Sequence, residues 1–501
     1  MIFKTLQKHT VLVASVSIIF ICTLMVFFAT ESSYNGIEQA SLWVRNYFGY
    51  FYLYLGLGCV LLLLGVALSP LGTIKLGKPD AKPEHSLWAW TAMLYSAGMG
   101  SGILLRAVQE PVFMQQHAPY TSTLSAETLA LEYTFYQWGL TAWAFYGLFA
   151  MVVGYALYVK RKHVRISATI EDDIQSETIR KSVDVITIIT TVFGLVAAIG
   201  LGTTQIKGGL NHVFKAELGL TTILVLCVGI SCIACYSAWQ GVNKGIKLFS
   251  KLNIIITLLI LLFIFVTSDM LSILNAFAQS TFHYIIDFIP MSLALGDYNP
   301  GMAFLTDWTF YYWAFWLAWA PFTGIFIARI SKGRTLRQLL LGVLIIPSLG
   351  TFFWFSVFGT SAFQLIEGME TYSNEFGNVF SSIFVFFQHY PMASVLNLTT
   401  ILLLVSFLVT SVDSAVFVLS MFTDKGSKDP NKKHRVIWSV FILLATIALV
   451  LLGNVKPDID VLGTVSKLLI ITSLPFAFFI LIMIAIFLKD VVKFKKSMPK
   501  R

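Results

Sequence analysis

Residues 308–322 read WTFYYWAFWLAWAPF, and nine of these fifteen residues are aromatic. The stretch is apolar enough to lie within a bilayer. On a helix, Tyr312, Trp316 and Trp319 would share one face, because they occur at i, i+4 and i+7. Since the face of an aromatic ring attracts a cation by about 0.5 to 2 kcal/mol, the pattern predicts a wall that binds a poorly hydrated cation. An aromatic belt at the membrane surface is the alternative.

The composition of the chain is that of an integral membrane protein. Of its 501 residues, 57% are hydrophobic and 12% are charged, and the mean hydropathy is +0.77. We expect an all-α fold, because the chain lacks the alternating apolar and polar pattern of membrane barrel strands. A helix needs about 20 apolar residues to cross a bilayer. Twelve stretches qualify, at residues 10–30, 47–69, 88–109, 131–158, 183–206, 219–240, 252–273, 308–330, 339–362, 397–421, 435–453 and 465–488.

The positions of the basic residues predict the orientation of these helices. Most of the 35 Lys and Arg residues fall in the two tails and in every second loop. By the positive-inside rule, both termini of this multi-pass protein would lie in the cytoplasm, below the plasma (inner) membrane. The net charge of +9 would then face anionic lipid, so it requires no nucleic-acid partner.

The motifs of the chain do not predict an enzyme. All five cysteines lie within apolar spans, which favours a packing role over redox chemistry. The sequence contains no nucleotide-binding or dinucleotide-binding motif, and the intramembrane residues Arg106 and Asp413 do not form a catalytic set. We therefore expect no cofactor, and we expect an ion gradient to supply any energy.

The segment SAGMGSG, residues 96–102, predicts an interruption of the third span. Each Gly costs about 1 kcal/mol relative to Ala inside a helix, and unpaired backbone at membrane depth is tolerated where it lines a cavity. In secondary transporters such breaks offer carbonyl groups to ions and substrates. Hydroxyls of Thr410 and Ser411 in the tenth span would complement these carbonyls around sodium. Close helix packing at the glycines and hydroxyls bonded to their own helix are the alternatives.

Five segments together resemble the betaine/choline/carnitine transporter (BCCT) family. They are LGKPDAKPEHSLWAWTAML at 76–94, SAGMGSGILLRAVQEP at 96–111, QWGLTAWAFYG at 137–147, the aromatic segment with ARISKGRT at 307–363, and TSVDSA at 410–415. The resemblance extends from about residue 45 to residue 490 and implies twelve helices. Two peripheral helices would precede two inverted five-helix repeats, as in sodium/amino-acid symporters. The implied division is 1–87 for the tail, peripheral helices and cytoplasmic loop, 88–273 for the first repeat, 274–488 for an extracellular segment and the second repeat, and 489–501 for a short basic cytoplasmic tail.

The resemblance also implies a small quaternary-ammonium or related zwitterionic substrate, such as glycine betaine, carnitine or a sulfonium compound, held in an aromatic box. The implied binding residues are Trp138, Trp143, Tyr146, Phe315, Trp316, Trp319, Gly100 and Gly102. Trp319 would be an additional ring on the pathway, and Phe315 replaces a Trp of the family pattern. Gly102 stands where choline-type members have an Asp, which favours a zwitterion that carries its own negative charge.

Arg106 departs from the family pattern, because an aromatic residue is usual at this position. It is an additional candidate for binding, since its guanidinium could pair with a substrate carboxylate or sulfonate. The alternatives are an ion pair with Glu110, four residues further along the helix, and extension toward the outer surface.

For the coupling ion, the resemblance implies that sodium is bound by five residues: the backbones of Ser96, Met99 and Phe407 and the hydroxyls of Thr410 and Ser411. Sodium-independent exchangers of the family have an Arg where this chain has Asn253. We therefore expect sodium-coupled import. The alternatives are sodium-independent or proton-coupled transport of choline or an anionic relative such as taurine, and a membrane receptor for such solutes. The family further implies a homotrimer.

Overall fold

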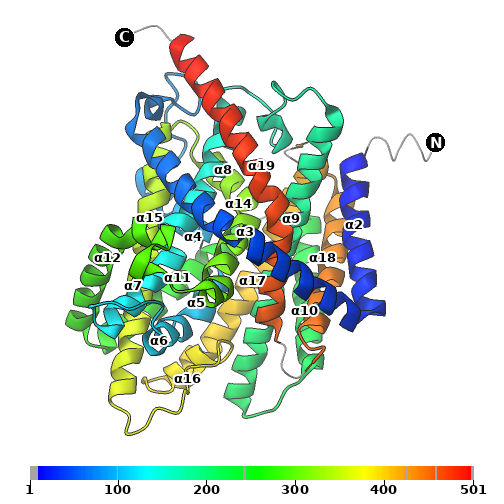
Figure 1. The fold of residues 1–501 in the computed structure, drawn as a ribbon. Helices are drawn as coiled ribbons and strands as arrows, with labels where there is room; N and C mark the ends of the chain where they lie inside the picture. The colour runs from blue at the N-terminus through cyan, green and yellow to red at the C-terminus, as the bar shows by residue number, and fades with distance from the viewer. Residues whose placement is uncertain are drawn as a thin grey trace.

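The computed structural model describes residues 9–98, 100–240, 244–424, 426–427, 429–456 and 460–497. Within these ranges the fold is a bundle of helices, and the only β-type pairing is an isolated antiparallel bridge between Lys75 and Thr335. The predicted all-α membrane fold is thus confirmed. In Figure 1, the first long helix begins and the last long helix ends toward the same end of the bundle.

Eleven of the twelve predicted spans coincide with helical regions of the described residues that are long and apolar enough to cross a membrane. They contain α2 (Thr10–Phe28), α3 (Thr30–Leu68), α7 (Ala126–Trp138) with α8 (Leu140–Tyr158), α9 (Glu177–Phe214), α10 (Leu220–Gln240), α11 (Lys244–Thr267), α13 (Met302–Phe304) with η4 (Leu305–Phe310) and α14 (Tyr311–Ile330), α15 (Leu336–Glu367), α17 (Ala393–Thr423), α18 (Lys432–Leu452) and α19 (Val461–Ser497).

The third predicted span, residues 88–109, is not one continuous helix. It is divided into α4 (Leu87–Gly98) and α5 (Ser101–Arg106), and the chain then continues into α6 (Gln109–Gln116). Gly100, which precedes α5, is extended, with φ −139° and ψ −167°. The chain is therefore interrupted within the predicted glycine segment, and neither piece reaches the length of a membrane span by itself.

The sequence analysis missed α12 (Met270–Leu293), which lies in the segment predicted to be extracellular and without a span. Its buried positions include Ile273, Tyr284 and Phe288, whereas Ile285 and Ile289 are exposed. The helix is amphipathic and carries Asn275, Gln279, His283 and Asp287, so it lacks the continuous apolar stretch by which the spans were predicted. The helix packs against α7 and α15, and this places it next to the candidate site. The remaining short elements are η1 (Pro70–Thr73), η2 (Ser167–Thr169), η3 (Gly296–Tyr298) and α16 (Ser382–Phe387).

Side-chain caps fix where several long helices begin. Ser176 accepts a hydrogen bond from the amide of Ile179 at the start of α9. Thr335 and Gln338 form a reciprocal capping box at the start of α15. Such caps satisfy amides that have no partner within the helix, each contributing about 1 kcal/mol. They fix the position of the loops that join the helices on the predicted cytoplasmic side.

The centre of the bundle is the contact between α8 and α14 (Figure 1). Gly324 of α14 lies so close to α8 that a Cβ atom there would be 2.3 Å from the Cβ of Phe149. Gly194 of α9 is similarly close to Ala318 of α14, at 2.9 Å for the added Cβ atom. Small residues allow helices in lipid to approach closely. The aromatic segment of α14 is therefore buried between other helices and does not face lipid.

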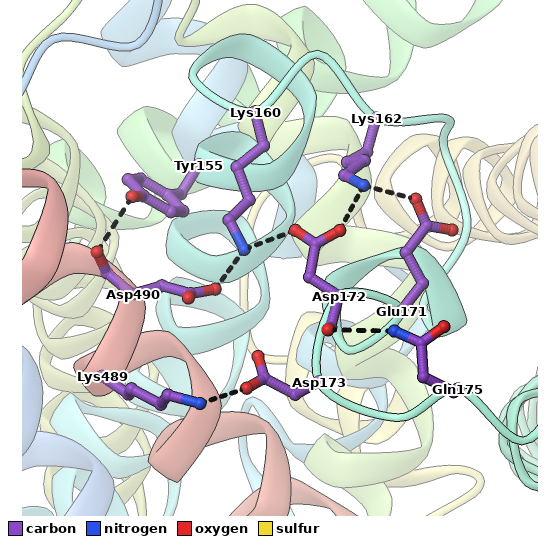
Figure 2. A network of polar contacts seen from close by, with 9 residues as sticks. All are labelled: Tyr155, Lys160, Lys162, Glu171, Asp172, Asp173, Gln175, Lys489 and Asp490. Carbon is purple, nitrogen blue, oxygen red and sulfur yellow. Dashed lines mark hydrogen bonds and ion pairs between the residues drawn. The ribbon is translucent and has the colours of Figure 1, made fainter.

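Ion pairs attach the loop between α8 and α9 to the end of α19 (Figure 2). Lys160 contacts Asp490, and Lys489 contacts Asp173. The hydroxyl of Tyr155 also donates to the backbone carbonyl of Asp490, at 3.4 Å. The last turns of α19 are thus bound to this loop by two ion pairs and to α8 by one hydrogen bond.

Asp172 lies at the centre of this network (Figure 2). One carboxylate oxygen is 2.6 Å from the Lys162 ammonium, and the other is 3.0 Å from that of Lys160. The ammonium of Lys162, and next that of Lys160, hold the pKa of Asp172 below its ordinary value of 3.8. Within the described part of the chain, the Glu171 carboxylate forms an ion pair with Lys162 alone, at 2.8 Å. The stabilising contribution of Asp172 is therefore present at neutral pH and is lost as the pH falls through its lowered pKa.

We predict that Asp172→Asn lowers the free energy of unfolding at pH 7 by at most about 1 kcal/mol, because the pairs are partly exposed. The difference from the unmodified protein should shrink as the pH falls below 3.8. Thermal unfolding of the purified protein in detergent, measured from pH 7 to acid, tests this expectation. Glu171→Gln is the matched control and should have a smaller effect. A difference that does not depend on pH would contradict the assignment.

Candidate functional site

A small cavity lies between α7, α8, α14 and α15. Six buried side chains line it: Trp138, Ala142, Trp143, Tyr146, Trp316 and Thr351. Four of them are the ring residues predicted to form the aromatic box, and they come from three helices. The structure thus places these four rings around one enclosed space.

The rings of this box meet mainly edge to face. Trp138 and Trp316 have centroids 5.1 Å apart at 73°, and Tyr146 and Trp316 are 6.0 Å apart at 88°. Trp143 and Tyr146 are 5.5 Å apart at 89°. The space between the rings is about 10 Å³, room for about one water molecule. Any larger group must therefore separate the rings when it enters.

A break in the helix at Gly139 positions Trp138 relative to Trp143. The residue joins α7 to α8, and a Cβ atom there would be 2.5 Å from the carbonyl oxygen of Phe135. The amide of Leu140 donates to the hydroxyl of Tyr284 in α12, at 2.9 Å. Because backbone groups freed at membrane depth need partners, α12 contributes directly to the shape of the site.

The two tryptophans that meet at the cavity are held by their indole N–H groups. That of Trp316 donates to the carbonyl oxygen of Gln137, at 3.0 Å. That of Trp138 is 3.2 Å from both carboxylate oxygens of Glu110. The hydroxyl of Tyr312 donates to the same carboxylate. These contacts fix which ring faces border the cavity.

Glu110 is the residue of this site that the sequence analysis did not assign to binding. Its side chain is fully buried, and the guanidinium of Arg106 lies beside it, 3.8 Å from Nε to Oε2. Arg106 also donates to Gln109 at 2.7 Å and lies over the ring of Trp308, 4.8 Å from its centroid. The i,i+4 spacing of Arg106 and Glu110 was the available signal. The structure shows this ion pair, and Arg106 does not line the cavity.

The remaining predicted binding residues do not line the cavity, and of these Phe315 and Gly102 lie next to rings of the box. Phe315 contacts Trp316 at 5.4 Å between centroids, and Trp319 contacts Phe315 at 6.4 Å. A Cβ atom on Gly102 would be 3.6 Å from the ring of Trp138, whereas one on Gly100 would meet nothing within 4 Å. Gly102 therefore leaves space beside Trp138.

The predicted sodium ligands lie partly outside the described residues. Met99 is outside them, and the side chain of Ser96 is not described. In α17, which packs against α5, the hydroxyl of Thr410 donates to the carbonyl oxygens of Ser406 and Phe407, at 2.9 and 3.1 Å. This back-bonding is the predicted alternative for the Thr410 hydroxyl.

The same stretch of α17 has polar atoms that lack partners. Ser406 Oγ and Asp413 Oδ1 are buried without a hydrogen-bond partner among the described residues. Buried oxygens of this kind usually have a donor or a cation beside them. The two residues are seven positions apart, about 10 Å along the helix, so their oxygens do not form a single site. Ser411, the other hydroxyl predicted to bind sodium, is half-buried.

Residues 10–496 match the family described as betaine/carnitine/choline family transporter. The chain belongs to this family. It is 37% identical over 484 residues to the glycine betaine transporter OpuD of Bacillus subtilis, covering 94% of this chain and 92% of the relative. It is 33% identical to an ectoine/hydroxyectoine transporter of Virgibacillus pantothenticus, covering 90% of each chain. It is 34% identical to a high-affinity choline transport protein of Escherichia coli, covering 88% of this chain and 66% of the relative.

A solved structure supports the fold of this betaine/carnitine/choline family member. The crystal structure of MhsT in complex with L-phenylalanine matches with a TM-score of 0.50, covering 80% of this chain and 89% of that chain. At 12% identity, the likeness establishes a shared fold alone. The family match and the relatives show that the chain is a transporter and not an enzyme.

We predict that Glu110→Gln and Arg106→Gln each lower the free energy of unfolding by about 3 to 5 kcal/mol, because each leaves a buried charge without its partner. The double substitution removes both charges and should cost less than the sum of the single changes. Thermal unfolding monitored by tryptophan fluorescence measures all four proteins. If the loss of unfolding free energy in the double variant equals the sum of the losses in the two single variants, the two side chains do not interact.

Proposed function

We propose that this protein is a sodium-coupled symporter that imports a small zwitterion with a quaternary-ammonium or sulfonium headgroup. The observation that carries the proposal is the cavity bounded by Trp138, Trp143, Tyr146 and Trp316. Each ring face can attract a methylated cation by about 0.5 to 2 kcal/mol, and more where water is excluded. Four aromatic rings around one buried site favour this headgroup over an apolar or anionic one.

The charges around the cavity favour a zwitterion over a bare cation. None of the six lining side chains is charged. The nearby carboxylate of Glu110 is already engaged by Trp138, Tyr312 and Arg106. A substrate that carries its own carboxylate would therefore bring the balancing charge with it. Glycine betaine is the first candidate, consistent with the name of the Bacillus subtilis relative, followed by ectoine and carnitine.

We propose sodium as the coupling ion, bound between the interrupted third span and α17. Thr410, Ser411 and the carbonyl of Phe407 would hold the ion from α17, and the backbone near the glycine segment would hold it from the other side. A bound sodium ion would supply positive charge that stabilises the backbone carbonyl groups without hydrogen-bond partners at the interruption of the third span. The buried Ser406 Oγ, which has no hydrogen-bond partner among the described residues and precedes Thr410 by one helical turn, supports a cation beside this turn.

We further propose that the protein lies in the plasma (inner) membrane with both termini in the cytoplasm. The basic loops support this orientation, and α2 begins at the end of the bundle where α19 finishes (Figure 1). A homotrimer is the assembly expected from the family.

We predict that Trp316→Ala lowers the uptake of labelled glycine betaine into reconstituted vesicles by at least about tenfold, because a cation–π contact worth about 2 kcal/mol is lost. The uptake by Trp316→Phe should lie between that of Trp316→Ala and that of the unmodified protein. Trp43→Ala is the control, since Trp43 is an exposed ring on α3. Unchanged uptake by Trp316→Ala would contradict the proposed site.

We predict that uptake requires an inward sodium gradient and that Thr410→Ala raises the sodium concentration for half-maximal uptake by about tenfold. Ser420→Ala is the matched control, because among the described residues this buried hydroxyl of α17 bonds only to the carbonyl of Val416. Uptake driven by a proton gradient or by exchange alone would favour the alternative transport of choline or an anionic solute. Binding without accumulation would favour a receptor.

A further inference from the structure

We propose that Arg334 is a positioning residue of the transport cycle, which latches α4 in its closed position on the predicted cytoplasmic side. The proposal rests on the proposed transport function. Arg334 lies in the loop between α14 and α15, and its guanidinium donates to the carbonyl oxygens of His85 and Ser86, at 3.0 and 3.3 Å. These two residues immediately precede α4. The guanidinium thus holds the first turn of the helix that ends at the glycine segment.

A second contact strengthens the attachment of α4. The Arg334 guanidinium lies over the ring of Trp90, 4.1 Å from its centroid. The indole N–H of Trp90 donates to Ser331 Oγ in the same loop, at 3.0 Å. Both Arg334 and Trp90 are buried, at 4% and 2% exposed. Arginine suits this role because its planar group can stack on a ring and donate to carbonyls at once.

The position of Arg334 does not depend on its own side chain. Backbone hydrogen bonds join its loop to residues 74–76: the amide of Leu76 donates to the carbonyl of Arg334 at 2.8 Å, and the amide of Gly333 donates to the carbonyl of Leu76 at 2.7 Å. Gly333 has φ +82°, a conformation that favours glycine. The loop should therefore persist when the guanidinium is removed.

The contacts of α4 are of a kind that can be broken and remade. Among the described residues, Arg334 has no carboxylate partner, and its Nε atom has no hydrogen-bond partner. Releasing it would leave two carbonyls free to bind water and would not leave a buried ion pair broken. Elsewhere α4 packs by rings against glycines of α15: a Cβ atom would be 2.2 Å from Trp90 at Gly342 and 2.0 Å from Tyr95 at Gly350. These contacts between a ring and a glycine can separate without a long side chain having to leave a space between other residues.

The interruption of the chain after α4 allows this helix to move by itself. Of the pieces that follow, α5 is joined to α6 by the Arg106–Glu110 pair, and α6 is held to the box by the hydrogen bond from Trp138 to Glu110. A helix that is latched at one end and interrupted at the other can tilt about the interruption. Release of Arg334 would then open a path from the predicted cytoplasmic side toward the cavity, while the aromatic box stays assembled.

Arg337 provides a comparison within three residues of Arg334. Its guanidinium donates to the carbonyl oxygens of Ala67 and Ser69, at 2.7 and 3.2 Å. These carbonyls lie at the end of α3 and just after it, so Arg337 attaches α3 and not α4. Both arginines thus bond to backbone carbonyls from neighbouring positions, but only Arg334 should control α4.

The test measures the exposure of α4 directly. In a background without the five native cysteines, Leu94→Cys places a thiol at a fully buried position of α4. A membrane-impermeant maleimide is then applied to vesicles of each orientation, without substrate. We expect Arg334→Ala to raise the rate of alkylation from the cytoplasmic side by at least about tenfold, and Arg337→Ala to leave it within about twofold.

A milder variant keeps the test decisive if Arg334→Ala does not fold. Ser331→Ala removes only the hydroxyl that accepts from Trp90, and it should raise the rate to a smaller degree. An unchanged rate in the folded variants, or an equal increase in Arg337→Ala, would overturn the latch. Alkylation does not require uptake, so sodium-driven uptake of glycine betaine by the unmodified protein tests the proposed function separately.

Discussion

The buried carboxylate of Glu110 is the interaction on which the arrangement of the site depends. It accepts hydrogen bonds from Trp138 of α7 and Tyr312 of α14, and Arg106 of α5 lies beside it. The carboxylate of Glu110 thus joins α5 and α6, which follow the glycine interruption, to α7 and α14, which carry rings of the box. Such a charge is costly in a bundle within lipid unless it is paired and hydrogen-bonded. Arg106 supplies the countercharge, which explains an otherwise expensive arginine within a predicted span.

Interrupted helices give the bundle both its binding surface and its means of movement. At Gly139, the freed amide of Leu140 bonds to Tyr284, so this break is fixed by α12. At Gly100, the extended residue separates α4 from α5, and α4 is attached by its own set of contacts. One interruption is therefore rigid and shapes the cavity, whereas the other leaves a helix whose position is set by a few breakable bonds.

Much of the fold followed from local patterns, because a membrane-spanning helix must be long, apolar and internally hydrogen-bonded. The residues of the aromatic box were assigned through the family resemblance, and the structure brings Trp138, Trp143, Tyr146 and Trp316 together. The helix break at Gly139 could not be predicted from the sequence, since single glycines are common in membrane-spanning helices. Glu110 fell just beyond the predicted span, and its burial depends on the path of α6. These features depend on tertiary packing, which no single stretch of sequence reports.

The edge-to-face packing of the four rings has a consequence for selectivity against inorganic ions. Potassium and ammonium hold their hydration shells tightly, and ring faces offer few oxygens to replace that water. A methylated onium group is weakly hydrated, because its methyl groups cover the charge. Under the proposed function, a chamber lined by indole and phenol rings would therefore select against the abundant inorganic cations through their cost of dehydration, without a charged side chain in its wall.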